Sequence, residues 1–239
     1  MEEATGTTSK GRGPADPASL SREILQLAVP ATLAIASEPI LNLADTAMIG
    51  RLGVEALAAR AIAAALIGGI YWIFAFLIFG TTTLVGRHFG ANERSACGEL
   101  CLHAIILAAI GGTALSLLCV LLAPQLFSLM GADATVQGAG VPYFRLRITG
   151  TPFTFIWLAT VGFLRGIQNT RTPMLIAFFV NGFNILLNYT LIYGKLGLPA
   201  MGLQGAAIGS LFCQFLGAGI CIGLLFFTSY ATEFGLDRW

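Results

Sequence analysis

Six long apolar stretches dominate this sequence and limit what it can fold into. They cover residues 24–49, 61–86, 100–122, 142–164, 173–193 and 203–227. A transmembrane helix needs about 20 mostly apolar residues to cross roughly 30 Å of hydrocarbon, and each stretch is long enough. The stretches are too long for the strands of a membrane barrel and lack its alternating pattern. We therefore predict an all-α integral membrane protein with six transmembrane helices.

The composition favours the same fold class. Hydrophobic residues make up 56% of the chain, charged residues 10%, and the mean hydropathy is +0.80, whereas soluble domains carry roughly 25% charged residues. The net charge of +1 indicates no polyanionic partner such as nucleic acid. The five cysteines lie mostly in apolar runs and frame no disulfide scaffold. A soluble enzyme and a nucleic-acid binder are disfavoured, and the lipid bilayer is the expected partner.

Polar segments flank the predicted six-helix lobe of residues 24–228. Residues 1–23 predict a flexible tail without an apolar signal region, and residues 229–239 a second tail or the start of a linker. With the N-terminus inside, the inner segments hold eight Lys and Arg residues and the outer segments five. This bias favours two cytoplasmic ends in a plasma or inner membrane. We place Arg145 and Arg147 of the fourth stretch at the interface, where long side chains can reach water.

Ionisable side chains inside the first apolar stretch are candidate functional residues. An ionisable group within a span costs about 2.5–3.5 kcal/mol on insertion. Glu38 and Asp45 are seven residues apart and share one helix face, with Asn42 between them. Pro30 and Pro39 each remove a helical hydrogen bond, which predicts bends with free carbonyl groups. We predict an ion-coupling site at Asp45, Glu38 and Asn42, with the two prolines as hinges.

A second polar stripe lies in the fifth stretch, at Asn181, Asn184 and Asn188. An amide that faced lipid would leave its hydrogen-bonding groups unpaired, so this face should contact other helices or a wet cavity. Gln214 of the sixth stretch is expected to line the same cavity. We predict that these four residues form a substrate cavity; the alternative is that the amides only bridge helices.

A weak internal repeat relates the two stripes. Residues 45–53 overlay residues 188–197 with one insertion, a period of about 143 residues. Many secondary transporters are built from internal repeats, with their sites at the repeat interface. The overlay predicts that Asp45 and Asn188 lie at similar depth and that their helices run in the same direction.

Neither metal nor nucleotide chemistry is indicated. His88, Cys97, Cys101 and His103 lack the paired-cysteine pattern of a zinc site. There is no phosphate-binding loop and no nucleophile–base set typical of an enzyme. We expect no enzymatic activity and no cofactor, so transport would use an H⁺ or Na⁺ gradient or a separate protein.

Three segments carry a resemblance to a known family: PILNLADTAMIGRLG at 39–53, GRHFGANE at 86–93 and GFLRGIQNTRTP at 162–173. In this order they resemble motifs of the multidrug and toxic compound extrusion (MATE) family, with its DinF-like branch as the closest fit. The resemblance covers about residues 20–228 and implies the N-terminal six helices of a twelve-helix transporter. It places the family's acidic position on Asp45 and its polar positions on Asn184 and Asn188. Bacterial relatives often carry Asp where Asn169 and Asn188 stand, so Asp45 would carry the coupling alone or with Glu38.

The resemblance implies an H⁺- or Na⁺-coupled antiporter that exports small organic or drug-like compounds. Its second six-helix lobe would be a missing C-terminal half or another copy. A carboxylate held away from water can take up a proton on one side and release it on the other. Two alternatives stay open. One is a non-transporting membrane scaffold or assembly subunit, and the other is a lipid-carrier flippase of the same superfamily, which would need a cationic cavity.

Overall fold

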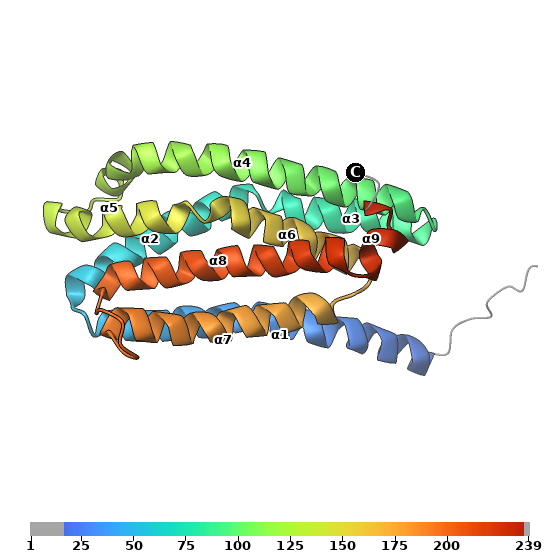
Figure 1. The fold of residues 1–239 in the computed structure, drawn as a ribbon, viewed down its shortest axis with the longest axis horizontal. Helices are drawn as coiled ribbons and strands as arrows, with labels where there is room; N and C mark the ends of the chain where they lie inside the picture. Colours follow the sequence, from blue (N-terminus) through green and yellow to red (C-terminus); the bar gives the residue numbers. More distant parts are fainter. Residues whose placement is uncertain (1–16, 237–239) are drawn as a thin grey trace, which may run out of the picture.

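The computed structural model describes residues 17–236, which form one bundle of helices (Figure 1). Six rods run the length of the bundle, two of them made of two helices each. The rods are α1 (Pro17–Gly50), α2 (Val54–Ile73) with α3 (Phe76–Gly90), α4 (Arg94–Leu129), α5 (Ala134–Ile148) with α6 (Thr151–Gly166), α7 (Arg171–Tyr193) and α8 (Gly202–Phe227). The short helix α9 (Ser229–Glu233) follows. The predicted all-α lobe of six membrane-length helices is confirmed.

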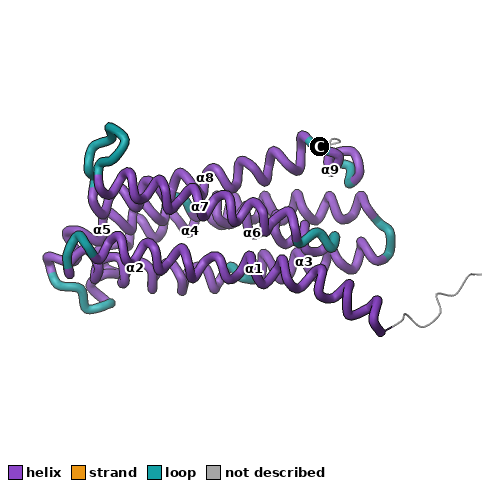
Figure 2. Tube along the Cα trace, turned by 90° about the horizontal axis from the view of Figure 1, so that it is seen from below, coloured by secondary structure: helices purple, strands orange, loops and turns teal. Residues whose placement is uncertain are grey.

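The outer surface of the bundle is apolar, as contact with lipid requires. Large hydrophobic side chains are exposed on α1, α2, α3, α4, α7 and α8; Trp72 is 77% and Phe227 88% exposed. Four segments are long and apolar enough by themselves to cross a membrane: Val54–Gly90, Arg94–Leu129, Arg171–Tyr193 and Gly202–Phe227. The other two rods, α1 and α5–α6, extend beside them (Figures 1 and 2).

Pro152 marks the break between α5 and α6. Because proline has no N–H group, the carbonyl of Ile148 loses its helical partner. The hydroxyl of Thr151 donates to that carbonyl instead, at 2.7 Å. Gly112, near the middle of α4, packs against Pro152. The break therefore lies at the middle of the bundle.

The fourth rod spans residues 134–166 and is longer than the predicted stretch of 142–164. Arg145 and Arg147 lie well inside this rod, since Arg147 is five residues from Pro152, or about 7.5 Å along a helix. The interface position of the two arginines stays a prediction. The prediction missed the polar first turns of α5, which continue the rod beyond its apolar part.

Both ends of the described chain lie at one end of the bundle (Figure 1). Helix α1 includes residues 17–23, so that part of the predicted flexible tail is helical; residues 1–16 and 237–239 lie outside the described part. The segment after α8 folds back onto the bundle, where Phe234 and Leu236 are buried. Glu233 pairs with Arg94, and the amide of Asn169 donates to the Tyr230 hydroxyl at 2.7 Å. Up to residue 236 this segment is docked on the bundle, and its role as a tail or as the start of a linker stays a prediction.

Candidate functional site

Helices α1 and α7 lie side by side and run in the same direction. The residue numbers of their contacts rise together along both helices. Three hydrogen bonds join Asn181 to Ser37, Asn188 to Asp45 and Tyr193 to the carbonyl of Met48, at 2.9, 2.9 and 2.8 Å. The predicted common direction and common depth of Asp45 and Asn188 are confirmed.

The carboxylate of Asp45 lies at the centre of this helix pair and is 8% exposed. The Nδ2 atom of Asn188, which is fully buried, donates to Asp45 Oδ1 and to Asn184 Oδ1, at 2.9 Å each. The opposite orientation of the Asn188 amide would set its oxygen against the carboxylate, so the charge fixes the orientation. Asn188 Oδ1 has no partner among the described residues, and a Cβ atom at Gly209 of α8 would overlap it.

Helix α8 packs against α7 at the site. Its buried Cys213 lies beside the amide of Asn184. We call Asp45, Asn184, Asn188 and Cys213 the Asp45 cluster. Close packing of α8 on α7 makes the cluster possible: besides Gly209, a Cβ atom at Gly205 would lie 2.6 Å from a backbone oxygen of α7. A buried carboxylate thus lies among amides and a thiol.

The charges of two arginines act on residues of the Asp45 cluster. The charges of Arg60 on α2 and Arg147 on α5 act on the Asp45 carboxylate, and that of Arg147 also acts on Cys213. The Nη1 atom of Arg147 is buried and lacks a hydrogen-bond partner among the described residues. Sequence reasoning missed Arg147 because it placed this residue at the interface. The signal was the proline five residues later, which marks a helix break inside the membrane.

The structure places Glu38 and Asn42 on the exposed side of α1, apart from the buried Asp45, and their part in an ion-coupling site stays a prediction. Both residues are exposed. Nη2 of Arg60 donates to the backbone carbonyl and to Oδ1 of Asn42, at 3.2 and 3.5 Å. On an ideal helix Glu38 lies about 20° from Asp45 and about 100° from Ser37, so residue spacing alone does not separate the exposed Glu38 from the buried Asp45. We call Glu38, Asn42 and Arg60 the polar strip.

The four predicted cavity residues divide into separate groups. Asn184 and Asn188 belong to the Asp45 cluster, whereas Asn181 bonds to Ser37 two turns away. Gln214 donates to the hydroxyl of Tyr71 at 3.2 Å, and that hydroxyl donates to Thr154 at 3.4 Å. This second polar group joins α8, α2 and α6 near the middle of the bundle.

The two predicted hinge prolines lie within a helix that continues through both. Helix α1 runs from Pro17 to Gly50 without a break. Pro30 is buried and Pro39 is exposed. Their role as hinges stays a prediction.

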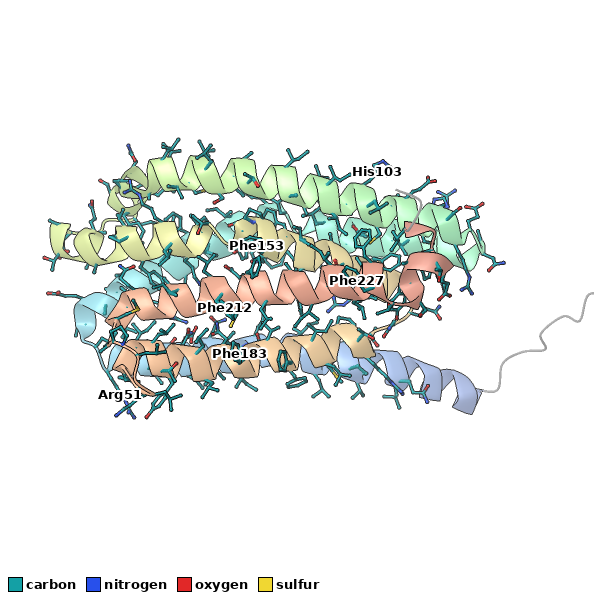
Figure 3. All side chains as sticks on the ribbon, in the orientation of Figure 1. Arg51, His103, Phe153, Phe183, Phe212 and Phe227 are labelled. Carbon is teal, nitrogen blue, oxygen red and sulfur yellow. The ribbon has the colours of Figure 1, made fainter. Side chains whose placement is uncertain are left out.

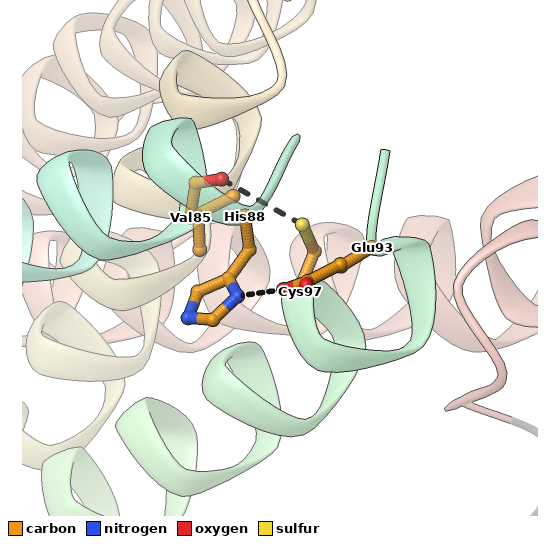
Figure 4. A network of polar contacts seen from close by, with 4 residues as sticks. All are labelled: Val85, His88, Glu93 and Cys97. Carbon is orange, nitrogen blue, oxygen red and sulfur yellow. Dashed lines mark hydrogen bonds and ion pairs between the residues drawn. The ribbon is translucent and has the colours of Figure 1, made fainter. Parts of the chain in front are cut away.

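The residues considered for a metal site have other contacts. Nδ1 of His88 lies 2.6 Å from the carboxylate of Glu93, and the thiol of Cys97 donates to the carbonyl of Val85 at 3.6 Å (Figure 4). His103 projects outward from α4 (Figure 3). Within residues 17–236 there is no group of three His, Cys, Asp or Glu side chains that could hold a metal ion.

Comparisons with known proteins agree on one family. The MatE family model matches residues 30–190. The chain is 28% identical over 211 residues to the probable multidrug resistance protein NorM of Thermotoga maritima. The aligned region covers 87% of this chain and 45% of that relative. It is 27% identical over 208 residues to DNA damage-inducible protein F of Escherichia coli, and that alignment covers 87% of this chain and 44% of the relative.

A solved structure of a MOP superfamily transporter from Pyrococcus furiosus superposes on the chain with a TM-score of 0.80 at 26% identity. The match covers 89% of this chain and 46% of that one. The chain therefore spans about half the length of the curated relatives it matches.

Proposed function

This chain belongs to the MATE (MatE) family of multi-pass membrane transporters, and on that premise we propose that it forms the ion-coupling lobe of a secondary active antiporter. The antiporter exports small organic compounds in exchange for H⁺ or Na⁺. Its place is the plasma or inner membrane, with both ends of the lobe cytoplasmic.

The burial of Asp45 between α1 and α7 is the observation that supports this proposal most directly. A carboxylate inside a membrane bundle is expensive to keep charged, so binding of a cation changes its interactions strongly. When Asp45 is charged, its hydrogen bond from Asn188 is charge-assisted; when Asp45 is neutral, that bond weakens. Cation binding thereby loosens α1 from α7, and Pro30 or Pro39 allows α1 to bend.

The polar strip supports the presence of a second lobe. Glu38 and Asn42 are exposed on a surface that is otherwise apolar. An ionised side chain that faced the lipid core would cost about 2.5–3.5 kcal/mol. The strip therefore faces an aqueous cavity shared with a second six-helix lobe, which either follows in a longer chain or belongs to another copy. Relatives of about twice this length fit that arrangement.

Efflux by the two-lobe transporter tests the proposal. The chain is reconstituted with its second lobe in proteoliposomes, and ethidium efflux is measured under an imposed H⁺ or Na⁺ gradient. Asp45→Asn should abolish the gradient-driven part of efflux. Asp133→Asn, which removes one charge at the start of α5, is the matched control and should transport normally.

Unchanged gradient-driven efflux in Asp45→Asn would remove Asp45 from the coupling mechanism. The scaffold alternative predicts a different result, in which Asp45→Asn lowers the stability of the lobe and no ion-driven flux exists in any variant. The flippase alternative predicts transport of a lipid-linked diphosphate instead of ethidium.

A further inference from the structure

Helices α1 and α7 form a pair that is tied to the rest of the lobe at few places. Within the pair, three hydrogen bonds join the two helices. Beyond it, α7 packs on α8, whereas the contacts of α7 with α6 and of α1 with α2 are few. In Figure 1, α8 lies between α7 and α6. Movement of the pair against the other rods is therefore opposed by α8 and by the contacts that hold the start of α7.

The docked segment, residues 228–236, holds the start of α7 through a short chain of hydrogen bonds. Its Tyr230 hydroxyl accepts from Nδ2 of Asn169 at 2.7 Å, and Asn169 lies in the turn before α7. Asn169 Oδ1 accepts the backbone N–H of Thr172, in the first turn of α7, at 3.1 Å. One side chain thus links the docked segment to the first turn of α7.

The other end of the docked segment is anchored by packing on α4 and α6. Phe234 is 1% exposed, and its ring meets that of Phe163 on α6 edge-on, with centroids 5.2 Å apart. The backbone of Phe234 lies directly on Gly98 of α4, where an added Cβ atom would overlap the Phe234 carbonyl oxygen. Gly235 has a φ of 67°, a conformation that favours glycine, and Leu236 beyond it is buried. The segment therefore bridges α4 and α6 to the start of α7.

Packing, and not charge, keeps the segment docked. Its Glu233 pairs with Arg94 of α4, but these two side chains are 39% and 45% exposed. Exposed ion pairs contribute little to stability, because water and salt screen them. Burial of Phe234 and Leu236 removes large apolar surfaces from water, which is the stronger effect.

We propose that the docked segment is a releasable restraint on the α1–α7 pair. While Phe234 is seated on Gly98, the segment fixes the start of α7 relative to α4 and α6. When the segment leaves this seat, the pair moves as one unit on α8, and Asp45 and Asn188 move with it. Short segments held by few side chains open locally at a low free-energy cost, so release does not require unfolding of the lobe. This inference goes beyond the proposed function, because it concerns how the pair is held and requires no ion coupling at Asp45.

Spin-label distances, measured by double electron–electron resonance on the chain in lipid nanodiscs, test this restraint. One label pair uses Leu175→Cys on α7 with Ile106→Cys on α4, and the other uses Leu175→Cys with Leu33→Cys on α1; all three positions are exposed. The five native cysteines are buried and should stay unlabelled, which the chain without introduced cysteines checks. Gly98→Ala and Tyr230→Phe should each shift the α7–α4 distance by about 2 Å or more, the size of helix shifts at packed interfaces. The α7–α1 distance should stay constant.

Hydrogen exchange followed by mass spectrometry reports whether the segment has left its seat. In Gly98→Ala the amides of residues 231–236 should exchange at least about fivefold faster, because the added methyl group overpacks a buried contact. Tyr230→Phe leaves the seat intact and cuts only the link to α7, so the double variant should shift the α7–α4 distance no further than Gly98→Ala does. The matched controls are Gly90→Ala, at a glycine with nothing within 4 Å, Tyr189→Phe, at an exposed tyrosine of α7, and Glu233→Gln, which removes the exposed ion pair. All three controls should keep both distances.

Three results would overturn the inference. The first is an unchanged α7–α4 distance in Gly98→Ala although the amides of the docked segment exchange faster. The second is an equal change of the α7–α1 distance, because α1 and α7 would then not move as one unit. The third is a shift in Glu233→Gln as large as that in Gly98→Ala, because the ion pair would then be the restraint. If Gly98→Ala does not fold, an unchanged α7–α4 distance in Tyr230→Phe decides against the inference by itself. A failure of the proposed function appears in the Asp45→Asn efflux assay instead and leaves these distances as they are.

Discussion

The hydrogen bond between Asn188 and Asp45 should contribute more to stability than its neighbour in the same helix pair. Asn188→Ala removes one bond to a carboxylate and one to an amide oxygen, both of 2.9 Å. Asn181→Ala removes a single bond of 2.9 Å to the hydroxyl of Ser37. A bond to a charged group contributes about 1.5–3 kcal/mol, and a bond between neutral groups about 0.6–1 kcal/mol. The expected losses are therefore about 2–4 kcal/mol for Asn188→Ala and about 1 kcal/mol for Asn181→Ala.

Unfolding by SDS titration in detergent micelles, followed by circular dichroism, measures both losses. The same two substitutions made in the Asp45→Asn background complete a double-mutant cycle. Removal of the charge should lower the loss caused by Asn188→Ala and leave that of Asn181→Ala unchanged. Equal losses for the two variants, or a loss for Asn188→Ala that does not depend on Asp45, would refute the reasoning that the carboxylate organises this helix pair.

Two further substitutions test the packing around the site and at the end of the bundle. Gly209→Ala should destabilise the lobe by about 1–3 kcal/mol, because the added Cβ overlaps Asn188 Oδ1; Gly182→Ala, with nothing within 4 Å, should leave stability unchanged or raise it by up to about 1 kcal/mol. Phe234→Ala, at a fully packed position, should lose about 3–5 kcal/mol, whereas Phe227→Ala, at an 88% exposed position, should change stability by less than about 0.5 kcal/mol. SDS unfolding measures each pair, and similar losses within a pair would show that the docked segment or the close helix contact is not formed.

The sequence predicted where the helices lie better than it predicted where they end. Apolar stretches indicate the part of a helix that contacts lipid, so they predict the number of rods and their order. They do not predict polar turns that continue a rod, as at the start of α5. They also do not predict a polar segment that docks on the bundle, such as α9. Those boundaries depend on packing against other helices, as when Phe234 is buried beside Gly98 of α4.

Within the candidate site, sequence spacing identified the two polar stripes, and the period of about 143 residues correctly paired Asp45 with Asn188. A period of 3.6 residues groups Glu38 with Asp45, but it does not say which of the two turns toward the neighbouring helix. That depends on how α1 is rotated against α7.

The sequence by itself determined that this chain is a six-helix membrane lobe with an acid in its first helix, because insertion into lipid depends on local hydrophobicity and a lone buried charge stands out against it. Only the tertiary structure decided that Asp45 is buried while Glu38 is exposed, and that Gly209 of α8 packs against Asn188 beside it. The physical reason is that helix rotation and interhelical distance are set by close contacts such as Gly209 against Asn188, which join residues far apart in the chain.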